Sequence, residues 1–123
     1  MPYYRVDFRH TQVGLRGLLA DSESYDSEAL FPRLVEAENA MESVGGRVLH
    51  LFYAFGTSDG FAIVEAPDDV ALAGAVLAVE AAGGVELSTT VLLTPEEFMA
   101  ALAQARKVKY RPPGPRSGKK NNG

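Results

Sequence analysis

The sequence predicts an α+β domain built on a four-stranded antiparallel sheet. Two strand-like runs, Val48 to Phe55 and Phe61 to Ala66, flank the segment Gly56 to Gly60, whose residue types favour a tight hairpin loop. Pro67-Asp68-Asp69 then begins a helix, with carboxylates at the positive end of its dipole. The segments follow one another in the order βαββαβ, and both crossovers should be right-handed. The compact solution is a ferredoxin-like domain with strand order 4-1-3-2, two helices on one face and an appended C-terminal helix.

The N-terminal half supplies the first strand and the helical segments before the hairpin. Tyr3 to Arg9 alternates apolar and charged residues, which is the pattern of a half-buried strand. Thr11 to Ala20 is predicted to be a short helix capped by its first residue, and Asp21 to Ser27 a polar loop. The next helix has Pro32 in its first turn, where the missing N–H costs nothing. It ends at Gly45-Gly46, as expected of a left-handed C-terminal cap.

The C-terminal half adds a helix, a strand and a last helix. Val70 to Ala82 is Ala-rich and nearly free of charge, so this helix must be covered on most sides. Val85 to Leu93 is the fourth strand. Thr94 to Glu97 forms a capping box with proline at the first helical position. We predict one ferredoxin-like domain over residues 1–108 and a basic, Pro/Gly-rich, mobile tail over residues 109–123.

Composition and charge exclude several classes of protein. The chain has 123 residues, enough for one domain, and no cysteine, which excludes disulfides, thiolate metal sites and cysteine nucleophiles. Arg5, Asp7 and Arg9 interrupt any signal-peptide core, and the longest apolar run is too short for a bilayer. All 16 acidic residues lie at or before Glu97, so the body should repel nucleic acid. We expect a cytoplasmic protein with neither a membrane nor a nucleic acid as partner.

The face of the predicted sheet that points away from the helices is too apolar for a soluble monomer. Five sizeable apolar residues lie on it: Val48, Phe52, Phe61, Ile63 and Leu92. The residues expected to face the helices are Tyr4, Val6, Phe8, Leu49, Leu51, Tyr53, Phe55, Ala62, Val64, Ala66, Val85, Leu87 and Val91. A second copy of the chain is the economical cover for the exposed side, and it would also protect the second strand as an edge. We therefore expect a homodimer.

Several short motifs, in their order and spacing, resemble the GYD-domain family of small bacterial proteins. The matching stretches are Tyr4 to Phe8, Thr11 to Leu15, Gly45-Gly46, Phe52 to Gly56, Asp59, Pro67 to Asp69 and Leu93 to Glu97. Two departures are visible: the Gly-x-Tyr-Asp turn of the family appears as Gly56-Thr57-Ser58-Asp59, and the Asp21 to Phe31 region is longer than the usual loop. The resemblance implies a dimeric α+β barrel. It implies no particular activity.

Polar side chains converge on the same exposed side of the predicted sheet. Titratable groups in an enclosed cavity indicate a site, here for a small organic molecule. The alternative is that these charges simply pair across strands at the dimer seam, the commoner case at interfaces. The predicted ligand-binding residues are Asp7, Phe52, Phe61, Ile63, Glu65, Glu86, Ser88 and Thr90, and the predicted catalytic residues are His50, Arg5 and Arg9.

His50 is the best single residue for chemistry, as a neutral base near pH 7 or as an axial haem ligand. With Arg5 or Arg9 it would suit a cofactor-free oxygenase or isomerase, by analogy at the level of the fold. A lone histidine on an edge strand is more often a packing residue. His10 is predicted to be a solvated loop residue. No His–His–carboxylate spacing is present, so we expect no metal site, and the sequence leaves any other cofactor open.

The loops and the tail carry weaker signals. Asp59 is expected to make an Asx-type turn bond within the hairpin. Tyr25 and Phe31 are expected to anchor their loop, with a lid over the cavity as the alternative. The hairpin lacks the following helix of a phosphate cradle, and the chain lacks the basic, aromatic-rich third strand of an RNA-binding sheet. The basic tail is expected to be solvated or to contact an acidic body.

Three functions remain open from the sequence. The first is a homodimeric module that binds a small molecule between two sheets. The second is the His50-dependent enzyme, and the third is a purely structural interaction protein.

Overall fold

The computed structural model describes residues 1–23 and 32–115. The elements are β1 (Tyr3–His10), α1 (Gln12–Ser22), α2 (Pro32–Glu42), β2 (Arg47–Tyr53), β3 (Gly60–Glu65), α3 (Asp69–Ala81), β4 (Val85–Leu92) and α4 (Pro95–Ala105). They belong to two compact units, of which the first is Met1–Leu93 and the second begins at Thr94. The sheet and the first three helices lie in the first unit.

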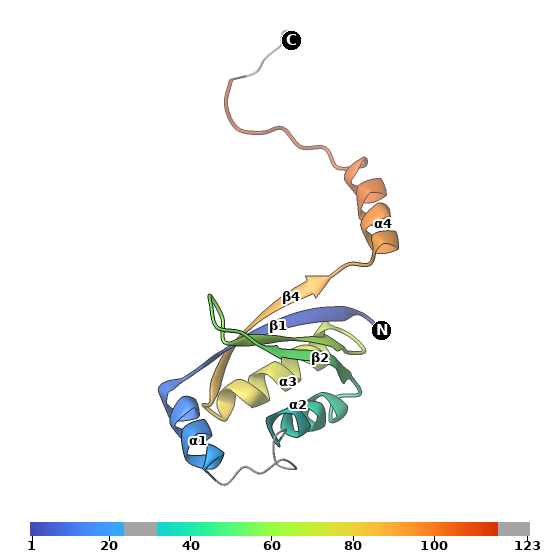
Figure 1. Cartoon of the computed structure of the whole chain (residues 1–123). Coiled ribbons are helices and arrows are strands. Elements are labelled where there is room, and N and C mark those ends of the chain that lie inside the picture. The colour runs from blue at the N-terminus through green and yellow to red at the C-terminus, as the bar shows by residue number, and fades with distance from the viewer. Residues whose placement is uncertain (24–31, 116–123) are drawn as a thin grey trace. The chain divides into compact units, whose positions relative to one another are not determined.

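The sheet confirms the predicted α+β class. Its strands lie in the order β2-β3-β1-β4, and every neighbouring pair is antiparallel. This is the predicted order 4-1-3-2 read from the opposite edge, and it is compatible with a ferredoxin-like fold. Helices α1, α2 and α3 lie on one side of the sheet (Figure 1). We call that side of the sheet the helix face and the other side the open face.

The core lies between the sheet and helices α2 and α3. Its buried members are Tyr4, Met41, Ala62, Val64, Ala66, Leu72 and Ala75. Tyr4 is 1% exposed, and its hydroxyl donates a hydrogen bond of 2.6 Å to Asp69 Oδ1 in the first turn of α3. This bond, followed by burial, raises the pKa of Tyr4 to about 12. The buried hydroxyl of Tyr4 thus has a hydrogen-bond partner, and this bond connects β1 to α3.

The predicted helix boundaries are largely confirmed by their caps. Asp68 Oδ1 accepts the N–H of Ala71 at the start of α3. At the start of α4, the Thr94 side chain and Glu97 form the predicted capping box. Gly45 follows α2 with a φ of 82°, the left-handed conformation that glycine adopts without strain. Local sequence signals therefore set where these helices begin and end.

The register of β2 corrects the face assigned to Val48. Val48 pairs with Val64, but His50 pairs with Ile63. The two positions are two residues apart in β2 and only one residue apart in β3, so β2 has one extra residue. This β-bulge at Leu49 breaks the simple alternation that the sequence suggested. Val48 consequently packs against the core on the helix face, and its placement on the open face is wrong.

The loop that connects the two strands of the hairpin is also longer than predicted. Strand β2 ends at Tyr53, and Phe55, which we expected to face the helices, is fully exposed at 108% in the connecting loop. The backbone N–H of Ala54 donates to the oxygen of Asp59, which closes the loop. Phe55 therefore contributes nothing to the core.

The second unit begins with α4, and residues 111–115 after it form neither helix nor strand. The predictions for Tyr25 and Phe31, and those for the tail after residue 115, fall outside the described residues. Within the part of the chain that the structure describes, no helix combines the length and the apolar character needed to cross a membrane.

Candidate functional site

All eleven predicted site residues lie on the open face. The register pairs Arg5 with Ile63 and Thr90, and Asp7 with Phe61 and Ser88. The remaining pairs across this face are Arg9 with Glu86, Phe52 with Phe61, His50 with Ile63, and Glu65 with both Tyr3 and Arg47. The sequence therefore grouped these side chains correctly. Their role in binding or catalysis stays a prediction.

A row of ring systems crosses the open face from β2 to β1. His50 stacks on Phe52 with ring centres 6.3 Å apart, and Phe52 meets Phe61 at 5.6 Å. The guanidinium of Arg5 lies over Phe61, 4.1 Å from the ring centre, which is a cation–π contact. Phe52 is 54% exposed although it lies in the middle of this row. The row is an apolar surface with a cationic end.

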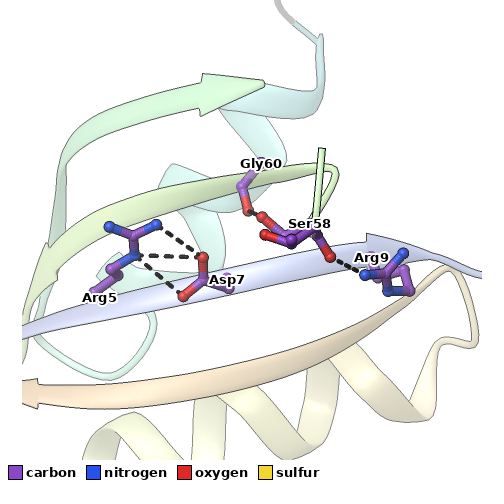
Figure 2. Close-up of polar contacts among 6 residues, drawn as sticks. Arg5, Asp7, Arg9, Ser58 and Gly60 are labelled. Atoms are coloured by element: carbon purple, nitrogen blue, oxygen red, sulfur yellow. Dashed lines mark hydrogen bonds and ion pairs between the residues drawn. The ribbon is translucent and has the colours of Figure 1, made fainter. Parts of the chain in front are cut away.

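Four of the charged side chains on the open face form ion pairs within one chain. Arg5 donates from Nε and Nη2 to the carboxylate of Asp7, two residues along β1, at 3.1 to 3.3 Å (Figure 2). Arg47 pairs with Glu65 on the neighbouring strand. The pairing across strands that we weighed as the alternative is therefore seen for Glu65, whereas Asp7 pairs along its own strand. Arg47 was missed by the sequence reasoning, although its place beside Glu65 follows from the hairpin register.

Arg9 has a different partner from Arg5. Its Nη2 donates to the backbone oxygen of Thr57 in the hairpin loop (Figure 2). In the same loop the Ser58 hydroxyl donates to the oxygen of Gly60 at 3.3 Å (Figure 2). Arg9 thus holds the loop against the end of β1.

In a single chain, the ring contact seen for His50 is with Phe52. Its ring is exposed and stacks on Phe52. A histidine that works as a base is usually oriented by a hydrogen-bond acceptor on its second ring nitrogen. The contact of His50 with an aromatic ring does not supply that acceptor.

His10 is the histidine with a carboxylate partner, and its prediction as a solvated loop residue is wrong. It is the last residue of β1, and its side chain is only 15% exposed. Its Nδ1 lies 3.3 Å from Asp59 Oδ2, and its backbone N–H donates to the same oxygen at 2.7 Å. The signal was available, because the alternation of Tyr4, Val6 and Phe8 continues to position 10.

The Asp59 side chain contacts the end of β1 and not its own turn. The predicted Asx-type bond is replaced by the contact with His10, 49 residues away in sequence. The backbone N–H of Asp59 also donates to the oxygen of Phe8 at 2.9 Å. The backbone N–H of His10, more than any other group, holds the pKa of the Asp59 carboxyl below its usual value. Asp59 is therefore a carboxylate that joins the hairpin to β1.

Two aromatic rings enclose His10. Phe8 meets it edge-on with ring centres 5.6 Å apart, and Tyr53 stacks on it at 6.5 Å with only 12° between the ring planes. Phe8 and Tyr53 also meet edge-on at 5.6 Å. We call these four residues, Phe8, His10, Tyr53 and Asp59, the His10 cluster.

The His10 cluster borders a groove of about 660 Å³ on the helix face, which we call the interlayer groove. Apolar side chains from the sheet and from the helices line it, among them Val6, Leu18, Leu51, Val64, Val76 and Leu87. A second pocket of about 570 Å³ shares five of its lining residues, follows β2 from Val48 to Leu51, and includes His50. The larger of these two pockets is therefore on the side of the sheet opposite to the predicted site.

Neither histidine belongs to a metal cluster in the described part of the chain. Across residues 1–23 and 32–115, no group of three or more histidine, cysteine, aspartate or glutamate side chains is placed to hold a metal ion. His10 and Asp59 form a pair without a third ligand of this kind.

One of the three comparisons with known proteins gives a match. The model of one protein family, the GYD domain, matches residues 6–102, which is well over half of the chain. The comparison with curated proteins gives no match, and neither does the comparison with solved structures. The match includes β1 from Val6 onward, the whole hairpin and most of α4. The chain belongs to the GYD-domain family.

Proposed function

We propose that the protein is a homodimeric module that binds a small organic molecule between the open faces of two copies. The observation that carries the proposal is the row of His50, Phe52, Phe61 and Arg5 on the face of the sheet opposite to α1, α2 and α3 (Figure 1). A contiguous exposed apolar surface of this kind marks an interaction site in a soluble protein.

Charge balance supports a second copy as the partner. Residues 1–105 carry 16 acidic and five basic side chains, so most surfaces of this domain repel one another. The open face is different, because it carries three arginines and three carboxylates: Arg5, Arg9, Arg47, Asp7, Glu65 and Glu86. A two-fold axis brings each such surface against itself, and a balanced face can then place opposite charges together.

The edge of the sheet supports the same partner. Strand β2 is at one edge, and its residues Phe52 and Tyr53 are more than half exposed. An exposed edge with high β-propensity is a site for pairing with another chain. A sheet-to-sheet interface of ordinary size buries roughly 1,200–2,000 Å² in total, which would cover both the row and the edge.

The ligand class follows from what the row offers. Phe52 and Phe61 present apolar ring surfaces, and Ser88 and Thr90 on β4 present hydroxyl groups on the same face. A two-fold axis repeats these hydroxyl groups, so a pocket made from two such faces suits a flat molecule with an apolar body and hydrogen-bonding groups at both ends, unlike a molecule with a single hydroxyl.

The oligomeric state tests the proposal first. Sedimentation equilibrium of the 13.2 kDa chain should give a dimer at tens of micromolar. Replacing Phe52 with Asp places two unpaired charges at the centre of the interface and should give a monomer. Phe55→Asp is the matched control, since Phe55 is exposed in the hairpin loop and belongs to no strand of the sheet. A monomeric wild-type protein, or a dimer that tolerates Phe52→Asp, contradicts the proposal.

Ligand binding is tested by thermal stabilisation with a library of metabolites. A ligand at 100 times its dissociation constant adds about 2.7 kcal/mol to the stability of the folded state, which is easily measured. The proposal expects at least one stabilising compound whose effect disappears with Phe52→Asp and persists with Phe55→Asp. No stabilisation across a broad library would favour the purely structural interaction protein.

A further inference from the structure

We propose a second binding site in the interlayer groove, where the His10–Asp59 pair accepts a hydrogen bond from the hydroxyl group of a small, largely apolar, neutral molecule such as a phenol. It lies on the helix face, opposite to the site between two copies, and does not depend on the dimer.

The contacts of His10 define which ring nitrogen can meet a ligand. Asp59 Oδ2 lies 3.3 Å from Nδ1, and an ionised carboxylate only accepts hydrogen bonds, so Nδ1 carries the proton. The lowered pKa of Asp59 keeps that carboxyl ionised. In the neutral imidazole Nε2 is then an acceptor, and the carboxylate makes it a stronger one. A ligand hydroxyl is the matching donor.

The contact between β1 and the hairpin does not require the imidazole ring of His10. The backbone N–H of residue 10 already donates to Asp59 at 2.7 Å, and any residue other than proline would supply that bond. An apolar side chain at this position would also pack between Phe8 and Tyr53. A half-buried polar ring in an aromatic setting costs free energy unless its polar atoms are used. Binding a donor at Nε2 is such a use.

The aromatic neighbours hold the imidazole in one orientation. Phe8 packs against it edge-on and Tyr53 lies nearly parallel to it, while Asp59 fixes Nδ1. A ring held on three sides keeps its remaining nitrogen in place. This preorganisation reduces the entropy lost when a ligand binds.

The groove selects the chemical class. Its volume of about 660 Å³ lies within the range of small-molecule sites, and its lining is mainly aliphatic. The charged side chains in its lining are Asp21 on α1 and Arg33 and Glu36 on α2. With Asp59 behind the imidazole, carboxylates outnumber arginines around the groove. An anionic ligand is therefore disfavoured, and a neutral molecule with one hydroxyl group fits.

The test compares two ligands that differ in one hydrogen-bond donor. 2-Naphthol and 2-methoxynaphthalene are titrated by fluorescence into the full chain at pH 7. The O–H of the naphthol can donate to Nε2, and the methyl ether cannot. We expect 2-naphthol to bind at least about ten-fold more tightly, since a hydrogen bond to a charge-assisted acceptor contributes roughly that factor. Equal affinities, or no saturable binding of 2-naphthol, overturn the proposal without any variant having to fold.

Substitutions then locate the site. His10→Gln keeps the backbone N–H that anchors the hairpin and removes the imidazole, so it should weaken 2-naphthol binding about ten-fold and leave the methyl ether unchanged. Asp68→Asn is the matched control, because Asp68 also accepts a backbone N–H at 2.8 Å but lies at the start of α3 and outside the groove lining. An unchanged naphthol affinity in His10→Gln, or an equal loss in Asp68→Asn, contradicts the assignment.

One further variant tests whether 2-naphthol binds in the interlayer groove or on the open face. The Phe52→Asp variant should still bind 2-naphthol with wild-type affinity. Loss of binding in that variant, with His10→Gln unaffected, would place the naphthol between two copies and reject the interlayer groove.

Discussion

The two faces of the sheet each carry one of the two histidines, and the two environments are opposite. His50 on the open face is exposed and stacks on Phe52, its neighbour two residues along the same strand. His10 on the helix face is mostly buried and contacts a carboxylate 49 residues away. The same residue type is therefore a surface packing group on one face and a member of an oriented pair on the other. The partner of His50 is local, whereas the carboxylate partner of His10 is distant in sequence.

The largest expected difference between the faces lies in their contribution to stability. Val64 and Ile63 are neighbours on β3, but Val64 is 2% exposed in the core and Ile63 lies on the open face. Val64→Ala should lower the free energy of unfolding by about 2 kcal/mol, because it removes buried methyl groups and leaves a cavity. Ile63→Ala should cost less than about 1 kcal/mol at concentrations where the chain is monomeric. Urea unfolding of dilute protein measures both, and equal losses would show that the open face is packed within one chain.

Tyr4 and Tyr3 give the next comparison. Tyr4→Phe removes the hydrogen bond to Asp69 and should cost about 1–2 kcal/mol at pH 7, whereas Tyr3→Phe on the open face should cost little. The measurement is the urea midpoint of each variant against the wild type.

The pH dependence of Tyr4 sharpens this result. Because the pKa of Tyr4 rises from 10.0 to about 12 in the folded state, its stabilising contribution is complete below pH 10. It is lost as the pH rises toward 12, since the unfolded state releases the proton first. The difference between wild type and Tyr4→Phe should shrink over this interval. A difference that stays constant from pH 9 to pH 12 contradicts the assigned bond.

Asp59 should show the opposite dependence. Its pKa is lowered in the folded state, so its carboxylate stabilises the protein above the ordinary value of 3.8 and loses that effect as the pH falls through the lowered pKa. Asp59→Asn should therefore have a lower Tm than the wild type at pH 7, and the gap should narrow at pH 3. A gap that stays constant as the pH falls below 3.8 would contradict the lowered pKa of this carboxyl.

The smallest effect is expected for the Arg5–Asp7 pair. Its side chains are 44% and 26% exposed, so the ion pair and the cation–π contact with Phe61 together should be worth no more than about 1 kcal/mol. Arg5→Met keeps the aliphatic stem over the ring and should change the Tm of the monomer by a degree or two. A larger loss in dilute protein would indicate that Arg5 has a structural role within one chain.

Much of the fold was predictable because its signals are local. The caps at Asp68 and Thr94, the glycine after α2 and the alternation along β1 each act within a few residues, and all of them appear in the structure. The bulge in β2 was not predictable, because it depends on how β3 pairs with it and not on the composition of β2. The face of Val48 was predicted wrongly for that reason.

The candidate site shows the same division. The eleven predicted site residues were grouped correctly on the open face, since alternation places them together once the strands are known. The pairing of His10 with Asp59 joins the end of β1 to the hairpin loop, and only the three-dimensional register brings them within 3.3 Å. The alternation of β1 identified the face of His10, but nothing local identified its partner.

The claim that the two faces serve separate purposes is tested most directly by one NMR experiment on the two histidine rings. A sample with His50→Gln assigns the His10 resonances. In wild-type protein, dilution through the dimer range should shift the resonances of His50 alone, and 2-naphthol should shift those of His10 alone. Resonances of both rings that move together in either titration would contradict the account.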